Sequence, residues 1–143
     1  MPSNHTRRHF LGACAALAVS AVVRPRVLGA DVVRVVPPGP HPTPRPGITG
    51  AKVLTKEQLV GKPQLVPLFD SVRDIPEIID GIRCNCGCVH YDGFYSLLSC
   101  YEGKDAMAKD CAICQGQGRL AVRLHKAGKS LDDIRAAVDA KFG

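Results

Sequence analysis

The sequence contains no tryptophan and few other aromatic residues, with three Tyr and four Phe among 143 residues. Proteins that bind nucleic acid need a concentrated basic patch together with aromatic side chains on which bases stack. The net charge of +6 does not supply that patch, because Arg7, Arg8, Arg24 and Arg26 all lie near the N-terminus. Without residues 1–30, 15 Lys and Arg face 13 Asp and Glu. Nucleic acid is therefore excluded as a partner.

The chain also lacks an apolar run long enough to span a membrane. The longest run ends at Val23 and has about 14 residues, whereas a membrane-spanning helix needs roughly 20. It follows the pair Arg7-Arg8 and precedes the small residue Ala30 at a suitable cleavage position. This layout resembles a twin-arginine export signal, with an ordinary secretory signal as the alternative. Residues 1–30 are therefore predicted to be a signal peptide for the twin-arginine export machinery, which places the protein in the periplasm or on the extracytoplasmic face of a membrane.

Six prolines fall between Pro37 and Pro46. Proline fixes φ and removes an amide donor, so this stretch is excluded from the interior of a helix or a sheet. An extended, polyproline-like chain of about 3 Å per residue is expected instead. We therefore predict that residues 31–50, which include His41, form a semi-rigid linker that holds residues 51–143 at a distance. A membrane-associated protein is the kind of partner that such a spacer suits.

Residues 51–143 carry several helix signals, no clear strand pattern and no internal repeat. Thr55 and Gln58 have the spacing of a capping box, which predicts a short helix. Pro67 argues against a strand in the apolar stretch around it. We therefore expect irregular structure in that stretch.

Isoleucines at helical spacing predict a further helix that Asp74 caps and Gly81 ends. It leads into residues 84–95, where glycines and turn-forming residues predict a loop. Two helices close the chain, the first capped by Asp110 and the second by Ser130, and glycines near the start of the first predict a bend. The fold class is therefore mainly α: a small helical domain with a cysteine-rich loop, preceded by a signal segment and a Pro-rich extended spacer.

Cysteine, in contrast, is abundant in residues 51–143. A domain of fewer than 100 residues buries little apolar surface, and disulfides or a metal ion often compensate. The cysteines follow the spacing C-x-C-x-C, eleven residues, C, ten residues, C-x-x-C, and a seventh, Cys14, lies in the signal, where it is expected to be lost on cleavage. The six cysteines of the domain are Cys84, Cys86, Cys88, Cys100, Cys111 and Cys114.

Metal binding makes most use of this crowding, and it is the function that we predict. Alternate side chains of an extended loop project the same way, and Gly87 allows the backbone to fold around an ion. Two cysteines of the triplet with Cys111 and Cys114 would form a tetrahedral four-sulfur site. Cys100, the third cysteine of the triplet and His90 would remain for a second ion or a bridging cluster. Soft thiolates select zinc, copper(I) or iron–sulfur.

Two alternatives stay open. A disulfide-stapled interaction module suits an oxidising exterior. However, cysteines one residue apart rarely bond each other, so Cys84, Cys86 and Cys88 would each need a distant partner. A dithiol oxidoreductase would use Cys111 and Cys114, but that chemistry is typical of a strand followed by a helix, and no strand is predicted there. No Ser/His/Asp or Cys/His arrangement accompanies the cysteines, so we expect a non-catalytic protein.

The stretch "IPEIIDGIRCNCGCVHYDGFYSLLSC", followed by "CAICQGQGRLAVRLHKAGKSLDDIRAAVDAKFG", resembles bacterial exported proteins that are named for a PCYCGC motif. The resemblance covers about residues 73–143. Gly87 and the cysteines match the motif, whereas Arg83 replaces its proline and Asn85 its tyrosine, which affects the loop conformation most. Members are generally extracytoplasmic, and many are lipoproteins. The resemblance therefore implies export and a cysteine-centred domain, without implying an activity.

Overall fold

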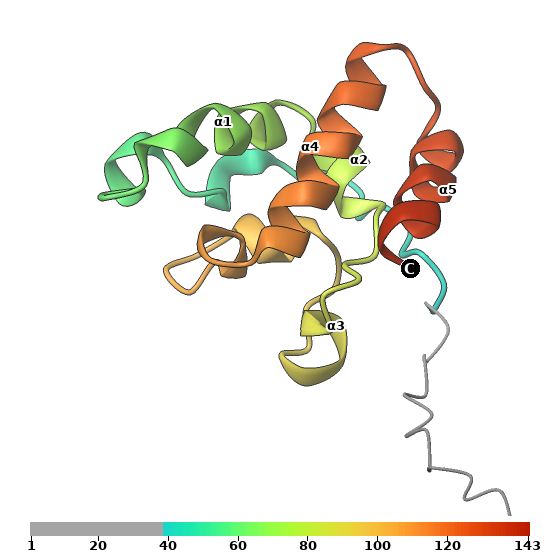
Figure 1. The fold of residues 1–143 in the computed structure, drawn as a ribbon, viewed down its shortest axis with the longest axis horizontal. Helices are drawn as coiled ribbons and strands as arrows, with labels where there is room; N and C mark the ends of the chain where they lie inside the picture. Colours follow the sequence, from blue (N-terminus) through green and yellow to red (C-terminus); the bar gives the residue numbers. More distant parts are fainter. Residues whose placement is uncertain (1–38) are drawn as a thin grey trace, which may run out of the picture. The chain divides into compact units, whose positions relative to one another are not determined.

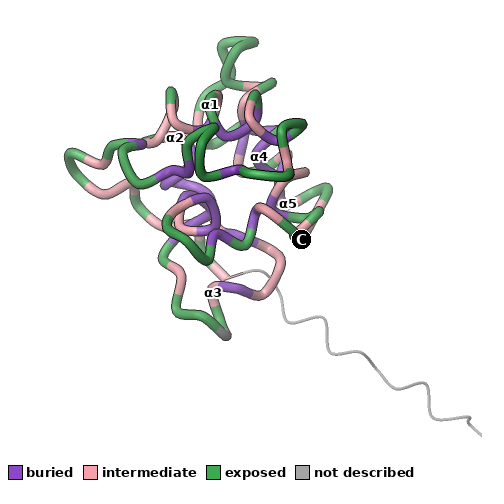
Figure 2. Tube along the Cα trace, turned by 90° about the vertical axis from the view of Figure 1, so that its left-hand side faces the viewer, coloured by how far each residue is buried: buried purple, intermediate pink, exposed green. Residues whose placement is uncertain are grey.

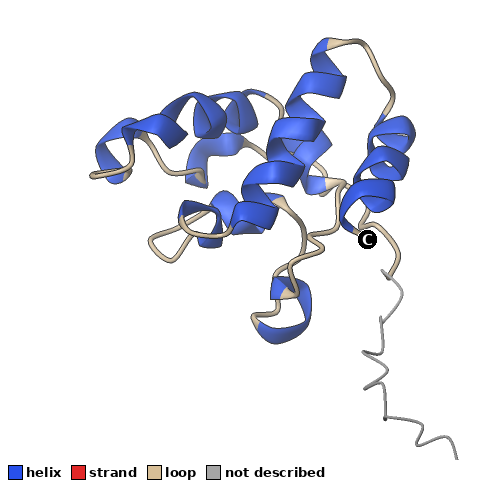
Figure 3. Cartoon of the chain, viewed as in Figure 1, coloured by secondary structure: helices blue, strands red, loops and turns tan. Residues whose placement is uncertain are grey.

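The computed structural model describes residues 39–143 (Figure 1). The predicted signal peptide and the start of the Pro-rich linker lie outside the described residues. The α-helices are α1 (Val66–Asp74), α2 (Pro76–Asp80), α3 (Cys88–Tyr91), α4 (Ala112–Lys126) and α5 (Leu131–Phe142). Single 3₁₀ turns are η1 (Gly50–Lys52), η2 (Lys56–Gln58), η3 (Pro63–Leu65), η4 (Leu98–Tyr101) and η5 (Met107–Lys109). Within residues 39–143 the only β pairing is one isolated bridge, which confirms the mainly α fold class (Figure 3).

Helix α4 lies between α1 and α5 and also packs against α2 (Figure 1). Buried positions gather where these helices face one another (Figure 2). Their apolar side chains include Leu68, Phe69, Val72, Ile79, Leu120, Ala121, Ile134 and Val138. Burying one such side chain is worth about 1.5–3 kcal/mol, so these contacts stabilise helices that are too short to form alone. No helix in the described part of the chain is both long and apolar enough to cross a membrane.

Two of the predicted local signals are present as expected. The N–H of Thr55 donates to Oε1 of Gln58 at 2.9 Å, although the helix that follows is only the single turn η2. At the start of α5, Oγ of Ser130 accepts the N–H of Asp133 at 3.2 Å, and Oδ2 of Asp133 accepts the N–H of Ser130 at 3.3 Å. The helix predicted to end at Gly81 forms as α2.

Other local predictions are wrong. Pro67 lies in the first turn of α1 and not in irregular chain, because a first-turn N–H has no acceptor within the helix and proline loses nothing there. Asp74 does not cap α2, whose N-cap makes no side-chain hydrogen bond. Asp110 does not cap α4. That position belongs to Cys111, which directly precedes the helix and whose Sγ accepts the N–H of Cys114 at 3.4 Å.

Helix α4 runs uninterrupted through Gly116 and Gly118. A side chain at Gly118 would collide with its neighbour, because a Cβ there would lie 2.1 Å from the hydroxyl oxygen of Tyr101. Tyr101 is fully buried, and its hydroxyl donates to the carbonyl of Cys114 at 2.7 Å. Gly118 therefore allows α4 to lie close against η4.

The described end of the Pro-rich linker contacts the helical domain, and we call residues 41–45 the strap. Arg45 donates to the fully buried carboxylate of Asp80 from Nη2 at 2.7 Å and from its backbone N–H at 2.8 Å. Tyr95 and Arg135 donate to carbonyl oxygens of the strap at 2.6 and 2.8 Å. The prediction of a spacer that stands away from the domain is therefore wrong for the strap, which packs against the domain. Proline removes N–H donors but leaves carbonyl acceptors, and the domain supplies the donors.

His41 connects the strap to the start of the cysteine-rich loop. Its Nδ1 accepts the backbone N–H of Arg83 at 3.0 Å, and its Nε2 lies 3.0 Å from Oδ2 of Asp139 on α5. The strap thus holds the residue that immediately precedes the first cysteine of the triplet.

Candidate metal centre

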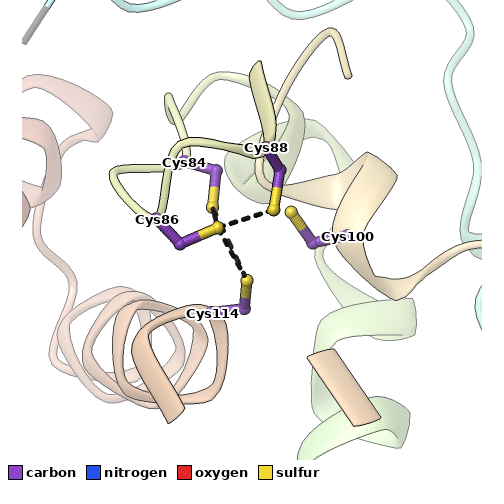
Figure 4. A group of neighbouring side chains, drawn as sticks. All are labelled: Cys84, Cys86, Cys88, Cys100 and Cys114. Carbon is purple, nitrogen blue, oxygen red and sulfur yellow. Dashed lines mark hydrogen bonds between the residues drawn. The ribbon is translucent and has the colours of Figure 1, made fainter. Parts of the chain in front are cut away.

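Three separate segments bring five cysteine side chains together (Figure 4). The loop after α2 supplies three of them, η4 supplies one, and the first turn of α4 supplies one. All five sulfur atoms lie within 4.8 Å of one another. We call this group the sulfur cluster, and its members are Cys84, Cys86, Cys88, Cys100 and Cys114.

The backbone around the sulfur cluster is shaped by local structure. Gly87 has a φ of 92°, a left-handed conformation that glycine adopts without strain, so the chain turns sharply between two of the cysteines. Residues 84–95 form the predicted loop apart from the single turn α3, which begins at Cys88. The N–H of Leu97 donates to the carbonyl of Ile82 at 2.7 Å, which holds η4 beside the end of α2. The hydrogen bond from the hydroxyl of Tyr101 to the carbonyl of Cys114 then holds η4 against the first turn of α4.

The sulfur atoms are in contact without being bonded. Sγ of Cys86 lies 2.7 Å from that of Cys88, 3.1 Å from that of Cys84 and 3.4 Å from that of Cys114. A disulfide bond is about 2.0 Å long, and all six cysteines of the described residues are free thiols. Tetrahedral zinc, with Zn–S bonds of about 2.3 Å, would space its sulfurs by about 3.8 Å. The distances of 3.4 and 3.6 Å from Cys114 to Cys86 and Cys84 are close to this spacing, whereas the two within the triplet are shorter.

Burial differs within the sulfur cluster. Cys84, Cys88, Cys100 and Cys114 are at most 4% exposed, whereas Cys86 is only partly buried. Cys86 also makes three of the four sulfur–sulfur contacts, which Figure 4 draws as dashed lines. The sulfur with the most contacts thus belongs to the least buried of the five cysteines.

The thiols influence one another's ionisation. Hydrogen bonds from Cys100 and Cys114 lower the pKa of Cys84 and of Cys86. Burial raises the pKa of Cys88 to about 12. The pKa of Cys114 is raised mainly because its thiol hydrogen-bonds with Cys100 and the other sulfurs, and burial raises it further. Neighbouring thiols are therefore shifted in opposite directions, since five thiolates at this spacing would repel one another strongly.

The residues present fit a soft cation. Five sulfur donors form a set that soft metal ions prefer and that calcium and magnesium do not. Among the described residues, no Lys, Arg or His hydrogen-bonds to the five sulfurs, so no basic side chain occupies the place of a cation. Buried amide atoms of Asn85 and Gln117 beside the cysteine segments have no hydrogen-bond partner in this part of the chain. Unpaired buried groups in a native protein require an explanation, and a bound ion or water is one.

Two predicted ligands lie outside the sulfur cluster. Cys111 is the N-cap of α4, and its place beside Cys114 and the triplet is taken by Cys100. His90 is exposed, and its Nε2 lies 2.7 Å from Nη2 of Arg83. The structure therefore brings together five of the seven predicted residues, and it replaces the predicted four-sulfur combination with another.

Gln117 and Asn85 are site residues that the sequence did not indicate. Gln117 is fully buried, and its Oε1 accepts the backbone N–H of Asn85 at 3.4 Å. A position three residues after Cys114 shares its face of α4, and this spacing is the one signal that pointed to Gln117.

Comparisons of the chain with protein-family models, with curated proteins and with solved structures find no match. The resemblance to exported proteins with a PCYCGC motif therefore stays a prediction, as do the signal peptide and the export that it implies. The five neighbouring cysteines are able to hold a metal ion, and this conclusion rests on the geometry of the sulfur cluster alone.

Proposed function

We propose that the domain binds one soft metal ion through the sulfur cluster, and that this ion stabilises the fold without taking part in catalysis. The observation that carries the proposal is that five sulfurs from three chain segments lie within 4.8 Å of one another. Thiolates gathered at this spacing repel one another, and a cation among them replaces the repulsion by coordination. The ion would thereby join α4, η4 and the loop after α2.

The spacing favours zinc or copper(I) over an iron–sulfur cluster. An iron–sulfur cluster binds its cysteines on its outside, so ligands of different irons are separated by the width of the cluster. Ligands of a single zinc ion lie about 3.8 Å apart. Sulfurs that are all within 4.8 Å of one another match the single ion.

The sulfurs divide into four ligands and one exchanging group. Tetrahedral zinc in a structural site is closed by four protein ligands, and four sulfurs are buried: Cys84, Cys88, Cys100 and Cys114. Cys86 is partly exposed and touches three of these four. It would meet an incoming ion first and pass it to the buried sulfurs, then move aside.

Export fits a metal-loaded domain. Twin-arginine substrates commonly cross the membrane already folded, often with a cofactor inserted, and residues 1–30 have the layout of that signal. An ion bound before export would protect the cysteines from oxidation outside the cytoplasm. We therefore propose a periplasmic or extracytoplasmic protein whose partners are the metal ion, the export machinery and a membrane-associated protein.

Elemental analysis of the full chain, purified from its native compartment, tests the proposal. We expect one zinc or copper ion per chain, with only sulfur ligands in X-ray absorption spectra. Cys114→Ser should lose the ion, whereas Cys111→Ser, three residues away on the same helix, should keep it. Metal-free protein that contains no free thiol after denaturation without reductant would contradict the proposal.

The contacts between sulfurs favour a second candidate, the disulfide-stapled module, because Cys114 offers the triplet a distant partner, with its sulfur 3.6 Å from that of Cys84 and 3.4 Å from that of Cys86, and an exterior compartment is oxidising. The six described cysteines would then form at most three bridges. Thiol counting separates the two candidates, since in protein that has lost Cys14 with its predicted signal peptide an ion leaves six titratable thiols after it is chelated and three bridges leave none.

A further inference from the structure

Gln117 lies beside the sulfur cluster with one polar atom unpaired. The residue is fully buried on α4, three residues after Cys114. Its Oε1 accepts the backbone N–H of Asn85, the residue between Cys84 and Cys86, at 3.4 Å. Its Nε2 is buried and has no hydrogen-bond partner among the described residues.

The contact with Asn85 fixes which way the amide of Gln117 faces. A backbone N–H can only donate, so the oxygen of the side-chain amide must face Asn85 and the nitrogen must face elsewhere. Cys114 shares this face of α4, and the sulfurs of Cys84 and Cys86 lie 3.6 and 3.4 Å from the sulfur of Cys114. The amide is therefore enclosed between the helix and the loop whose cysteines meet at the sulfur cluster.

A buried donor without an acceptor costs free energy, and native proteins rarely leave one. Thiolate sulfurs bound to an ion are acceptors, and metal binding would create them on Cys114 and on the cysteines that flank Asn85, the two segments that Gln117 joins. Side chains that hydrogen-bond to metal ligands fix the orientation of the ligand and adjust its electron density.

We infer that Gln117 is a positioning residue for the bound ion, with Nε2–H donating to a thiolate of the loaded sulfur cluster. This inference rests on the proposed metal binding. The hydrogen bond withdraws negative charge from one sulfur and holds the loop of Cys84 and Cys86 against α4. The competing arrangement is a purely structural amide pair, in which Nε2 turns to the side chain of Asn85, whose Oδ1 is also unpaired.

The test compares Gln117→Met with Gln115→Met in the full chain. Both variants replace a glutamine on α4 by an apolar side chain of similar length. Nε2 of Gln115 donates to the carbonyl of Ala108 at 2.9 Å, so it is already paired away from the sulfur cluster. We expect Gln117→Met to bind zinc about 10–100-fold more weakly, in competition with a chromophoric chelator. The urea midpoint of its metal-free form should change little, because removal of the unpaired donor offsets the loss of the acceptor for the N–H of Asn85. Gln115→Met should show the reverse: a lower midpoint and unchanged zinc affinity.

Cobalt(II) supplies a readout that a structural role would not move. Loss of a hydrogen bond makes the sulfur more electron-rich, so the sulfur-to-cobalt charge-transfer band should shift to lower energy in Gln117→Met and stay in place in Gln115→Met. Gln117→Glu keeps the acceptor for Asn85 but loses the donor, and it should also bind zinc more weakly than the wild type.

The outcomes separate the two proposals. If the wild type binds neither zinc nor cobalt(II), the proposed function is wrong and the role of Gln117 falls with it. If the wild type binds both ions and Gln117→Met matches its affinity and its band position, only the inference about Gln117 is overturned.

Discussion

The C-terminal helix pair, residues 112–142, and the cysteine segment, residues 83–101, are stabilised in different ways. In the helix pair, Ile134 and Val138 are fully buried, and a capping box begins α5. In the cysteine segment, three thiols are buried, and the side-chain amide of Asn85 has no partner among the described residues. Its helices are single turns, which have no stability of their own.

If the domain binds an ion as proposed, the two regions should depend on it to different degrees. Apolar contacts between helices need no ion, whereas the clustered sulfurs would be stabilised by a cation. Helix α4 belongs to both regions, since its first turn carries Cys114 and its later turns pack against α5. Changes in the two regions should therefore separate in experiments that resolve individual residues.

Removing the ion should have the largest effect, and it should be confined to the cysteine segment. In anaerobic protein with a chelator, we expect amide exchange at His90 and Asp92, whose N–H groups bond within the turn of α3, to accelerate by at least about 100-fold. Structural zinc supplies about 10–16 kcal/mol in zinc-finger peptides, so this expectation is modest. The amides of Ile134 and Val138 should change by less than about tenfold, as hydrogen exchange with mass spectrometry can show. An equal acceleration of amide exchange in both regions would contradict the expectation that only the cysteine segment depends on the ion.

Asp80→Asn comes next, because Asp80 holds the strap against the residues that precede the cysteines. Its carboxylate is fully buried and bonds to Arg45 and Ser96 at 2.6–2.8 Å. Removing one partner of a fully buried ion pair costs about 3–5 kcal/mol. Since the Arg45 side chain is 40% exposed, we expect about 2–4 kcal/mol in urea unfolding of the metal-free protein at pH 7.

The same variant predicts a pH dependence. Burial acts to raise the pKa of Asp80, but hydrogen bonds from Arg45 and Ser96 outweigh it and hold the pKa below its ordinary value of 3.8. A lowered pKa in the folded state contributes stability that is complete above pH 3.8 and is lost as the pH falls through the folded-state pKa. The stability difference between wild type and Asp80→Asn should therefore shrink below pH 4. A difference that stays constant from pH 7 to pH 3 would exclude this carboxylate as its source.

Helices α2, α4 and α5 were predictable because their signals are local, as the capping box of Ser130 and Asp133 shows, whereas α1 was missed. The membership of the sulfur cluster was not, because it depends on how α4 crosses η4. The C-x-x-C spacing favoured Cys111 as a ligand, yet a cysteine directly before a helix can also cap it, and here it does. Cys100 comes two residues after the buried Leu97 and Leu98, and this apolar context is a signal for burial that the cysteine spacing alone does not contain.

The packing of the strap and the role of Gln117 could not be predicted from the sequence either, because both depend on tertiary contacts. A proline-rich stretch indicates an extended chain, but whether it stands free depends on donors elsewhere, such as Arg135, that reach its carbonyls. Glutamine in a helix is usually exposed, and only the tertiary contact with Asn85 distinguishes Gln117 from Gln115.

Gly118→Ala should disturb the surface that the two regions share. A Cβ at this position would lie 2.1 Å from the hydroxyl oxygen of Tyr101. We expect a loss of about 1–3 kcal/mol, as for other overpacked cores, together with weaker metal binding, because Tyr101 bonds to Cys114.

Gly116→Ala is the matched control on the same helix. Its Cβ would lie 2.9 Å from the ring of Phe142, which is only partly buried in the last turn of α5 and can turn aside. The helix propensity of alanine, about 1 kcal/mol better than that of glycine, should offset this contact. Similar losses in both variants, measured by urea unfolding, would show that the contact with Tyr101 is not decisive.

The smallest effect is expected for Ser130→Ala, which removes the cap of α5 and leaves the sulfur cluster untouched. Loss of such a cap costs about 1 kcal/mol, and the bond from Asp133 to Oγ of Ser130 is exposed to solvent. We expect this loss to be the same in metal-loaded and metal-free protein, and the zinc affinity to be unchanged, in paired urea unfolding and chelator competition measurements. Because the helix pair is complete without the ion, a cap whose contribution depended on bound metal would show that the two regions are not independent.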